Sequence, residues 1–480
     1  MIDDVHLDGD GPLQHQLYQQ LTQRIIHRRY LPGNRLPSSR QLAQDLGVSR
    51  NTVTAVYDQL KAEGFLQSRA GQGVFVHENI SPSMLQPGKG STLRPLSTSG
   101  LLPPIPQLTD RHINRAEDAS LPFQPGLPDL EAFPIRSWNR ILHHHESRRA
   151  LRGYDSTQGY RPLRRAIAEY LRSSRGVRCQ EQQVIITNGA QQALSLIVDV
   201  LLEPGDPVFC ENPGYRGARY ALASRDNPIT PVPLREQVLD VDALNALGPA
   251  KLLFCTPTHQ YPMGGILDIS QRMALLHWAQ RNQTWVIEDD YDSEFHFHKK
   301  PFAAIQGMYE DAPVLYVGSF SKTLMPALRV GYLVVPEPLV EHFVQSKRTH
   351  GGESPLLTQA TIAEFIETGQ FTRHLRRMRQ LYRGKWLHFQ ARVAEELGGL
   401  VTPVAESAGM HLVLEGNFDD QELSRWLRTQ GIGSTPLSAH FTGDAASTGL
   451  VMGFASASER EIEQCVSLLK QWLTSSMISG

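Results

Sequence analysis

Hydrophobic residues recur at two different spacings along the chain. Near the N-terminus, apolar positions at helical spacing predict a helix over residues 13–29, which ends before a turn at 30–33: Leu13, Leu17, Leu21 and Ile25. From about residue 110 onward, helical patterns alternate with short β-rich runs, which predict strands at 183–187, 207–210, 251–255, 284–288, 314–318 and 331–335. Strands separated by helices predict an α/β fold with a mostly parallel sheet, covered on both faces, with ligands at the strand ends.

Two shorter helices follow the first. Ser38 or Ser39 is placed to cap one helix, Gly47 lies in the turn, and Ser49 is placed to cap another that runs to about Glu63. Short helices joined by a glycine turn are typical of a helix-turn-helix. The start of the second helix is where side chains of such motifs meet base edges and phosphates.

A hairpin with a basic, glycine-rich tip comes next, between residues 65 and 76. We interpret it as a wing that lies along DNA. The predicted DNA-binding residues are Arg35, Ser38, Arg40, Ser49, Arg50, Asn51, Thr52, Arg69 and Gly71. A helical hairpin used as a dimerisation arm is the alternative, but it gives arginines at these positions no packing role.

Charge divides the chain in the same way. Residues 11–77 contain eight Lys and Arg against three Asp and Glu, although the whole chain has a net charge of −2. A basic N-terminal segment is compatible with nucleic acid, and the remainder is acidic.

Length and composition indicate the organisation. A chain of 480 residues exceeds the usual size of one hydrophobic core. We predict a winged helix-turn-helix at 11–78, a flexible linker rich in Pro, Ser and Gly at 79–109, and a large α/β domain at 110–480. Such a linker lets the helix-turn-helix lie far from its own large domain, so that domains can be exchanged between protomers.

The four cysteines lie far apart with no CxxC pair, which argues against a zinc site or a disulfide framework and favours a reducing compartment. The N-terminus has no apolar signal region, and no apolar stretch is long enough to cross a bilayer. We expect a cytoplasmic protein without a metal and without a membrane partner.

Lys322 is the first candidate for chemistry. It follows the predicted strand at 314–318, and Ser319, Ser321 and Arg329 lie close to it in sequence. A lysine that an aldehyde can reach, beside hydroxyls and a guanidinium that can bind phosphate, suits a Schiff base with pyridoxal 5′-phosphate (PLP). The alternative is an ordinary surface lysine.

Other strand ends carry groups that fit the same cofactor. The turn and helix start at Gly189, Ala190 and Gln191 offers free N–H groups to a phosphate, and the ring of Tyr215 can stack on a pyridine. In the acidic run at 288–292, a carboxylate can pair with the pyridinium nitrogen, and Tyr291 can bond the ring oxygen or the aldimine. A magnesium site is the alternative for these acids.

Three further clusters remain open. The histidines at 143–145 and at 296 and 298 have no partners at ligand spacing in the sequence, which favours solvated or packed side chains over a metal. The basic helical stretch at 374–379 fits either a solvated face or a contact with an interface or with DNA.

Several phrases resemble known families. LPSSRQLA, VSRNTV and the GxGxFV pattern resemble the winged helix-turn-helix of the GntR family of bacterial regulators. SFSKTLMPALRVGY, EDDYDSEF, ENPGY and TPTHQYPMG resemble the fold type I PLP-dependent aminotransferases. Together they resemble the MocR, or GabR-like, subfamily of GntR-family transcriptional regulators.

The resemblance implies a role for each matching residue. Lys322 would carry the Schiff base, Asp289 would pair with the pyridine nitrogen, Tyr291 would contact the ring oxygen and Tyr215 would stack on the ring. Tyr154 would reach the phosphate of the partner subunit, which implies a head-to-tail homodimer.

Two positions depart from working aminotransferases. His259 stands where those enzymes have an asparagine, and Val451 stands where they have the arginine that holds a substrate carboxylate. The sequence therefore predicts a transcriptional regulator that binds operator DNA and senses either PLP or an amine. The other end of such an amine would be held by Arg216, Arg219 or Arg348. A genuine aminotransferase with an accessory DNA-binding domain is the main alternative, and a DNA-binding protein whose large domain only dimerises is a third.

Overall fold

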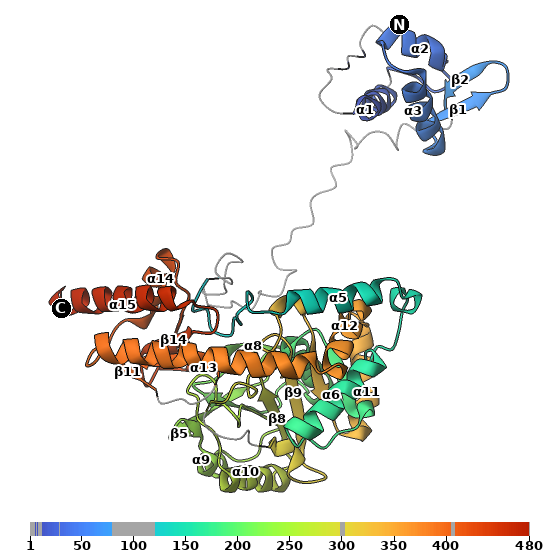
Figure 1. The fold of residues 1–480 in the computed structure, drawn as a ribbon. Helices are drawn as coiled ribbons and strands as arrows, with labels where there is room; N and C mark the ends of the chain where they lie inside the picture. The colour runs from blue at the N-terminus through green and yellow to red at the C-terminus, as the bar shows by residue number, and fades with distance from the viewer. Residues whose placement is uncertain are drawn as a thin grey trace. The chain divides into compact units, whose positions relative to one another are not determined.

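A computed structural model describes residues 12–27, 29–78, 121–297, 303–404 and 409–479, together with Val5 and Leu7. The chain divides into two compact units, residues 1–111 and 112–480, here called the helix-turn-helix unit and the large unit (Figure 1). The linker predicted at 79–109 lies outside the described residues.

The helix-turn-helix unit has three helices and a hairpin: α1 (Leu13–Ile26), α2 (Ser39–Leu46), α3 (Arg50–Ala62), β1 (Leu66–Arg69) and β2 (Gly73–Val76). Ser38 and Ser49 both cap helices, since their hydroxyls accept hydrogen bonds from the backbone N–H groups of Gln41 and Thr52 at 3.2 and 3.1 Å. Gly47 ends α2 in the left-handed conformation, with φ of 66°, which glycine adopts without strain.

The first helix is shorter than predicted. Helix α1 ends at Ile26, not at residue 29, because Arg29 and Tyr30 both turn their N–H groups back to the carbonyl of Arg24. Its apolar positions Leu17, Leu21 and Ile25 are buried against α3 as the four-residue spacing requires. The hairpin closes this core with Leu66 and Val76.

The large unit contains most of the secondary structure. Its helices are α5 (Ile135–Glu146), α6 (Arg161–Ser174), α7 (Ala190–Leu201), α8 (Arg216–Leu222), α9 (Val241–Leu247), α10 (Ile269–Arg281), α11 (Val340–Thr349), α12 (Leu356–Glu367), α13 (Gln370–Glu396), α14 (Asp420–Thr429) and α15 (Glu459–Ser479). Its first seven strands after the hairpin are β3 (Val184–Thr187), β4 (Val208–Asn212), β5 (Ile229–Arg235), β6 (Val238–Leu239), β7 (Leu252–Cys255), β8 (Trp285–Asp290) and β9 (Val314–Ser319), followed by β10 (Gly331–Val334).

These eight strands form one sheet in the order β3-β10-β9-β8-β7-β4-β5-β6. The strands from β9 to β5 run parallel, whereas β10 is antiparallel to both of its neighbours and β6 is antiparallel to β5. The mostly parallel α/β sheet and all six predicted strands are confirmed. The last two strands of this order, β5 and β6, were not predicted.

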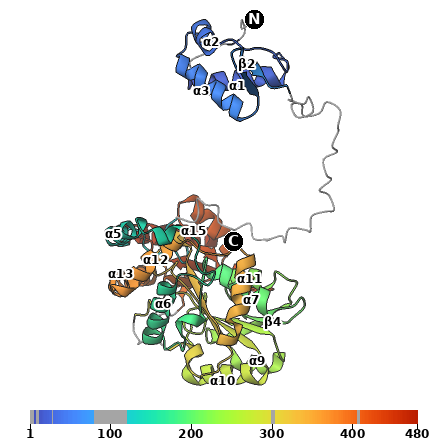
Figure 2. The ribbon, with the colours of Figure 1, turned by 90° about the vertical axis from the view of Figure 1, so that its right-hand side faces the viewer.

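Alternation along the strands divides the core into two faces. Ile185, Leu315 and Leu333 pack on one face with α7 and α11, while their neighbours Ile186, Tyr316 and Tyr332 pack on the other face with α6 and α12. Figure 2 shows α7 and α11 on the opposite side of the sheet from α6. A sheet buried on both faces has its polar groups where the strands end.

A second sheet of four antiparallel strands lies near the C-terminus and was not predicted: β11 (Thr402–Pro403), β12 (His411–Glu415), β14 (Gly449–Gly453) and β13 (Thr435–Pro436), in that spatial order. No helix in the described part of the chain is both long and apolar enough to cross a membrane.

Candidate functional site

A cavity of about 400 Å³ opens at the ends of the strands of the large sheet. All the predicted cofactor-binding residues except Tyr154 line it: Gly189, Ala190, Gln191, Tyr215, Asp289, Tyr291, Ser319, Ser321, Lys322 and Arg329. Groups that lie up to 140 positions apart in the sequence are thus brought to one place by the ends of β3, β4, β8 and β9.

Lys322 lies just past β9 and is half-buried, with its side chain in the cavity wall. Its Nζ donates a hydrogen bond to the carbonyl oxygen of Gly126 at 2.7 Å. Burial lowers the pKa of this amine, and the carboxylates of Asp292 and Asp289 oppose that shift. A lowered pKa increases the share of neutral amine, which is the form that attacks a carbonyl.

An anion cradle lies beside the lysine. Ser319 Oγ donates to Ser321 Oγ at 2.9 Å, and Arg329 is held in place by a hydrogen bond from Nη2 to the carbonyl of Asn188 at 3.0 Å. Gly189 precedes the first turn of α7, and a Cβ at this position would lie 3.6 Å from that guanidinium. Hydroxyls, a guanidinium and a helix N-terminus together suit a phosphate.

Asp289 is the buried carboxylate of this cavity. Burial, followed by the nearby charges of Asp290 and Asp292, raises its pKa to about 7. Among the described residues, none donates a hydrogen bond to its side chain. A buried carboxylate without a donor is stabilised by a cation, and a protonated pyridine nitrogen would be one.

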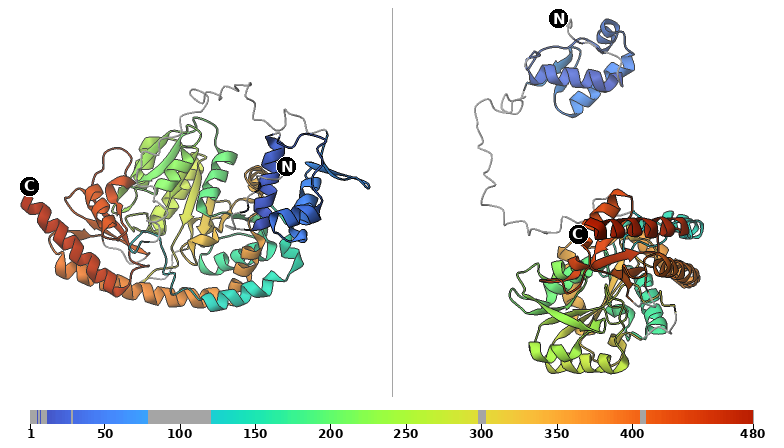
Figure 3. Two further views of the ribbon diagram at one scale, coloured as in Figure 1. Left: turned by 90° about the horizontal axis from the view of Figure 1, so that it is seen from above. Right: turned by 90° about the vertical axis from the view of Figure 1, so that its left-hand side faces the viewer.

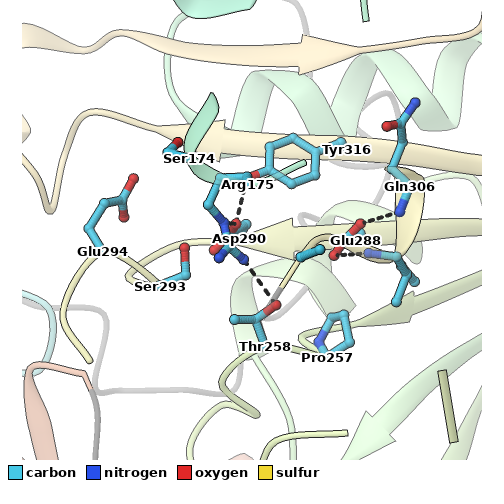
Figure 4. Close-up of polar contacts among 12 residues, drawn as sticks. Ser174, Arg175, Pro257, Thr258, Glu288, Asp290, Ser293, Glu294, Gln306 and Tyr316 are labelled. Carbon is cyan, nitrogen blue, oxygen red and sulfur yellow. Dashed lines mark hydrogen bonds and ion pairs between the residues drawn. The ribbon is translucent and has the colours of Figure 1, made fainter. Parts of the chain in front are cut away.

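Figure 4 shows why Glu288 and Asp290 do not join Asp289 in the cavity. Glu288 accepts hydrogen bonds from the backbone of Ile305 and Gln306 at 2.9 and 3.0 Å. Asp290 forms an ion pair with Arg175 at 2.7 Å and also accepts from the hydroxyl of Tyr316. Although burial alone would raise it, these partners hold the pKa of Asp290 below its usual value.

The alternation of β8 therefore separates the acids. Glu288 and Asp290 point to the opposite face from Asp289, so the four carboxylates do not converge as a magnesium site requires. The only group of potential metal ligands within the described residues is His144, His145 and Glu364.

That histidine group has a different explanation. The carboxylate of Glu364, on α12, lies 3.0 Å from both histidines, a partner that the sequence did not reveal. Arg148 donates to Nδ1 of His145 at 2.9 Å, which places the ring proton on Nε2. With its proton on Nε2, the ring of His145 is neutral and turns an N–H toward Glu364, so this nitrogen has no lone pair to offer a metal.

The aromatic groups of the cavity are held by neighbours. Gln191 donates to the hydroxyl of Tyr215 at 3.0 Å, and burial raises the pKa of that tyrosine. The hydroxyl of Tyr291 lies 2.7 Å from Nδ1 of His259, which also lies 2.9 Å from a carboxylate oxygen of Asp292. His259, which replaces the expected asparagine, thus anchors Tyr291 beside the cavity.

Sequence reasoning missed several residues of the cavity wall: Pro125, Gly126, Thr256, Tyr261, Asp292, Pro326, Met410 and His411. Of these, Asp292, Thr256, Tyr261 and Pro326 belong to phrases that the sequence analysis singled out, but no role was assigned to them. Gly126 and His411 reach the cavity through tertiary packing and carry no local signal.

Neither Val451 nor the arginines proposed to hold an amine effector line the cavity. Val451, on β14, is fully buried among Met263, Val413 and Leu437 and does not line the cavity. Neither do Arg216, Arg219 and Arg348. Among the described residues that line the cavity, Arg329 alone carries a guanidinium.

Tyr154 is the one predicted cofactor-binding residue that does not line the cavity. It is 96% exposed and lies in the loop after the short 3₁₀ helix Arg149–Arg152. The buried Lys347 donates to the carbonyl of Thr157 in the same loop at 2.6 Å. The loop is thus anchored while Tyr154 extends into solvent.

The predicted DNA-binding residues gather on the helix-turn-helix unit. Arg40, Ser49, Arg50, Asn51 and Gly71 are exposed, and Thr52 is half-buried. Arg69, in the wing, stacks over Phe75 at 4.5 Å and forms an ion pair with Glu78. Arg35 is exposed and lies against Gly73 of the hairpin, and Ser38 is occupied as a helix cap.

Fold and site together define a class: a helix-turn-helix protein joined to an aminotransferase-like unit. The family model for bacterial regulatory proteins of the gntR family matches residues 13–76, and that for aminotransferases of class I and II matches residues 127–476. A solved structure of LysN, an α-aminoadipate aminotransferase from Thermus thermophilus, is similar to 75% of this chain, with 94% of its own length covered, 28% identity and a TM-score of 0.70.

Full-length relatives share both units. The chain is 37% identical over 96% of its length to a probable rhizopine catabolism regulatory protein, MocR, of Rhizobium meliloti, of which it covers 94%. It is 31% identical over 94% of its length to the pyridoxine biosynthesis transcriptional regulator PdxR of Corynebacterium glutamicum, of which it covers 96%. The chain belongs to the MocR-type subfamily of GntR-family HTH-type transcriptional regulators.

Proposed function

We propose that this protein is a PLP-binding transcriptional regulator. It binds operator DNA through the winged helix-turn-helix and senses PLP, or an amine, through the aminotransferase-like unit. The observation that carries the proposal is the convergence of Lys322, Asp289 and Arg329 on one cavity in a chain that begins with a GntR-type unit. A large unit used only for dimerisation would have no reason to hold these three groups together.

The residues present fit the cofactor. Ser319, Ser321, Arg329 and the N-terminus of α7 would hold its phosphate, and Tyr215 would cover its ring. PLP, when bound, supplies an aldehyde for amines and an electron-withdrawing ring. Asp289 would keep a proton on the ring nitrogen, because a pyridinium beside this buried carboxylate would stabilise its charged form.

DNA would be bound by the exposed start of α3 and by the wing. Arg50, Asn51 and Thr52 stand where recognition helices meet base edges and phosphates, and Arg69 stands where a wing meets the backbone. Ser38 and Ser49 contribute by fixing the starts of the two helices.

We further propose a homodimer in which Tyr154 completes the cofactor site of the other protomer. A tyrosine that is 96% exposed, on an anchored loop, serves no packing purpose within one chain. The head-to-tail arrangement inferred from the sequence remains part of this proposal.

PLP itself is the favoured effector. The cavity retains the groups that fit PLP, and Arg329 is its only guanidinium among the described lining residues, so a carboxylate would find no second clamp. The name of one relative, a pyridoxine biosynthesis regulator, agrees with a response to vitamin B6. An amine without a carboxylate is the remaining effector class.

The decisive experiment combines absorbance with DNA binding. Purified protein is stripped of cofactor, and its spectrum and its affinity for fragments of its own genome are measured with and without PLP. We expect a new visible band and a changed pattern of bound fragments. Rapid turnover of an amino donor and a keto acid, with DNA binding unaffected, would instead establish the aminotransferase alternative.

A further inference from the structure

Six exposed arginines lie on two neighbouring helices of the large unit and have no role in the cavity: Arg136, Arg140, Arg373, Arg376, Arg377 and Arg383. We call this surface the arginine face. The first two lie one turn apart on α5. On α13, Arg376 and Arg377 lie three and four residues after Arg373, and Arg383 lies seven after Arg376, which places the four along one side of that helix. Figures 1 and 3 show α13 and α5 along the same edge of the large unit.

The two helices are joined where the arginines lie. Arg377 donates a hydrogen bond to the carbonyl of Ala132, just before α5, and the ring of His374 packs edge-on against Phe133 with centroids 5.7 Å apart. The arginines of α5 and α13 therefore belong to one continuous surface. The basic stretch noted in the sequence at 374–379 is only its central part.

The charge of this face is not neutralised. Within the described part of the chain, none of the six arginines forms an ion pair, and Arg373 and Arg377 donate only to carbonyl oxygens. The carboxylates nearby have other partners, since Glu367 pairs with Arg165 and Asp129 with Lys385. Glu131 adjoins the start of α5, so the face keeps a large positive excess in a chain whose net charge is −2.

Physical chemistry favours a polyanion as the occupant. Arginine stays charged at any physiological pH, so the face keeps its positive charge and attracts an anionic partner. From Arg373 to Arg383 the row covers about 15 Å of helix, which matches several successive phosphates of a DNA strand. A second copy of the chain fits poorly, because a two-fold contact would set arginine against arginine.

We propose that the arginine face binds the phosphate backbone of duplex DNA next to the segment held by the helix-turn-helix unit. This rests on the DNA binding proposed above and extends it to the large unit. The contact is independent of base sequence and lengthens the stretch of DNA that one chain engages.

The test uses the full chain and a duplex of random sequence, about 60 base pairs long, over a series of salt concentrations. The variant is Arg140→Ala/Arg376→Ala/Arg383→Ala, three residues that make no hydrogen bond or ion pair with other described residues. The matched control is Arg161→Ala/Arg165→Ala/Arg235→Ala, which removes the same charge from arginines that pair with carboxylates.

We expect the variant to lose about tenfold in affinity and about two to three units of the slope of log K against log salt, whereas the control stays within about twofold of the wild type. Ultraviolet crosslinking should join DNA to peptides of α5 or α13 in the wild type and not in the variant. Equal binding by variant and control would overturn the proposal.

Two further outcomes would also overturn it. A change of oligomeric state in the variant, measured by light scattering without DNA, would assign the face to a protein contact. Failure of the wild type to bind any duplex would reject the proposed function together with this inference. The inference alone fails when Arg50→Ala weakens binding as proposed and the triple variant does not.

Discussion

The helix-turn-helix unit presents its polar residues outward, and all of the predicted DNA-binding residues lie between Arg35 and Gly71. The large unit instead buries its polar residues in a cavity drawn from strand ends between Gly126 and His411. Exposed arginines act through charge that salt screens, whereas buried groups act through fixed geometry and shifted pKa values. Substitutions in the two regions should therefore differ in size and in the kind of measurement that detects them.

The largest effect is expected at the centre of the cavity. Lys322→Ala should abolish covalent attachment of PLP, because no other described lysine lines the cavity. Borohydride reduction followed by mass spectrometry checks this. The control is Lys347→Ala, which removes a lysine that is also buried but lies outside the cavity. A tag on any other lysine of the wild type would remove Lys322 from the site.

The buried ion pair between Arg175 and Asp290 should be nearly as sensitive to substitution. Arg175→Leu leaves Asp290 buried without its cation, which costs about 3–5 kcal/mol in the free energy of unfolding. Denaturant unfolding measures this loss, and the added substitution Asp290→Asn should restore part of it. An unchanged midpoint for Arg175→Leu would mean that the network of Figure 4 contributes little to stability.

Asp289→Asn should act on both the cofactor and the pH dependence. Losing a buried charge pair costs about 2 kcal/mol, or about a 30-fold weaker affinity for PLP by spectroscopic titration. In the protein without cofactor, the folded pKa of about 7 lies above the usual 3.8, so the folded state binds more protons and loses stability as pH rises between these values.

The asparagine variant lacks this penalty. Without cofactor, it should melt at a higher temperature than the wild type above pH 7, and the two should converge below about pH 4. Glu211 and Glu288, whose pKa values burial also raises to about 7, titrate in both proteins and so cancel in the comparison. Identical melting at all pH values would show that Asp289 is not a strained carboxylate.

Substitutions in the helix-turn-helix unit should give smaller effects that depend on salt. Arg50→Ala should reduce the slope of log K against log salt by about one unit. Arg69→Ala should do less, since Arg69 must first leave Glu78, and Glu78→Gln should strengthen DNA binding for the same reason. Electrophoretic mobility shifts at several salt concentrations separate the three, and an Arg69 effect equal to that of Arg50 would contradict this order.

The smallest effect is expected from α-amino acids. At millimolar concentration they should leave the cofactor band and DNA binding unchanged, because the cavity offers no second guanidinium among its described residues. Val451→Arg should not restore a clamp, since Val451 is packed in the core beside Met263 and Leu437. A rapid spectral change with an α-amino acid would mean that another group holds the carboxylate.

The sequence predicted what local chemistry controls. Ser38 and Ser49 cap their helices. Strands β3, β4, β7, β8, β9 and β10 lie where β-rich runs predicted them, because strands buried on both faces of a sheet are mostly apolar. The second sheet escaped prediction because β11 and β13 have only two residues each and show no period. The pairing of His259 with Asp292 escaped for a related reason, since 33 positions separate the two.

A substitution at Gly126 would displace the amine of Lys322 without removing any cofactor-binding side chain. A methyl group at this position would lie 2.3 Å from Nζ of Lys322, and the φ of 77° already disfavours any other residue. Gly126→Ala would therefore push the amine aside while every cofactor-binding group remained in the chain. Such a variant would keep an unchanged helix-turn-helix unit. Substitution of this one glycine therefore separates effector sensing from DNA binding.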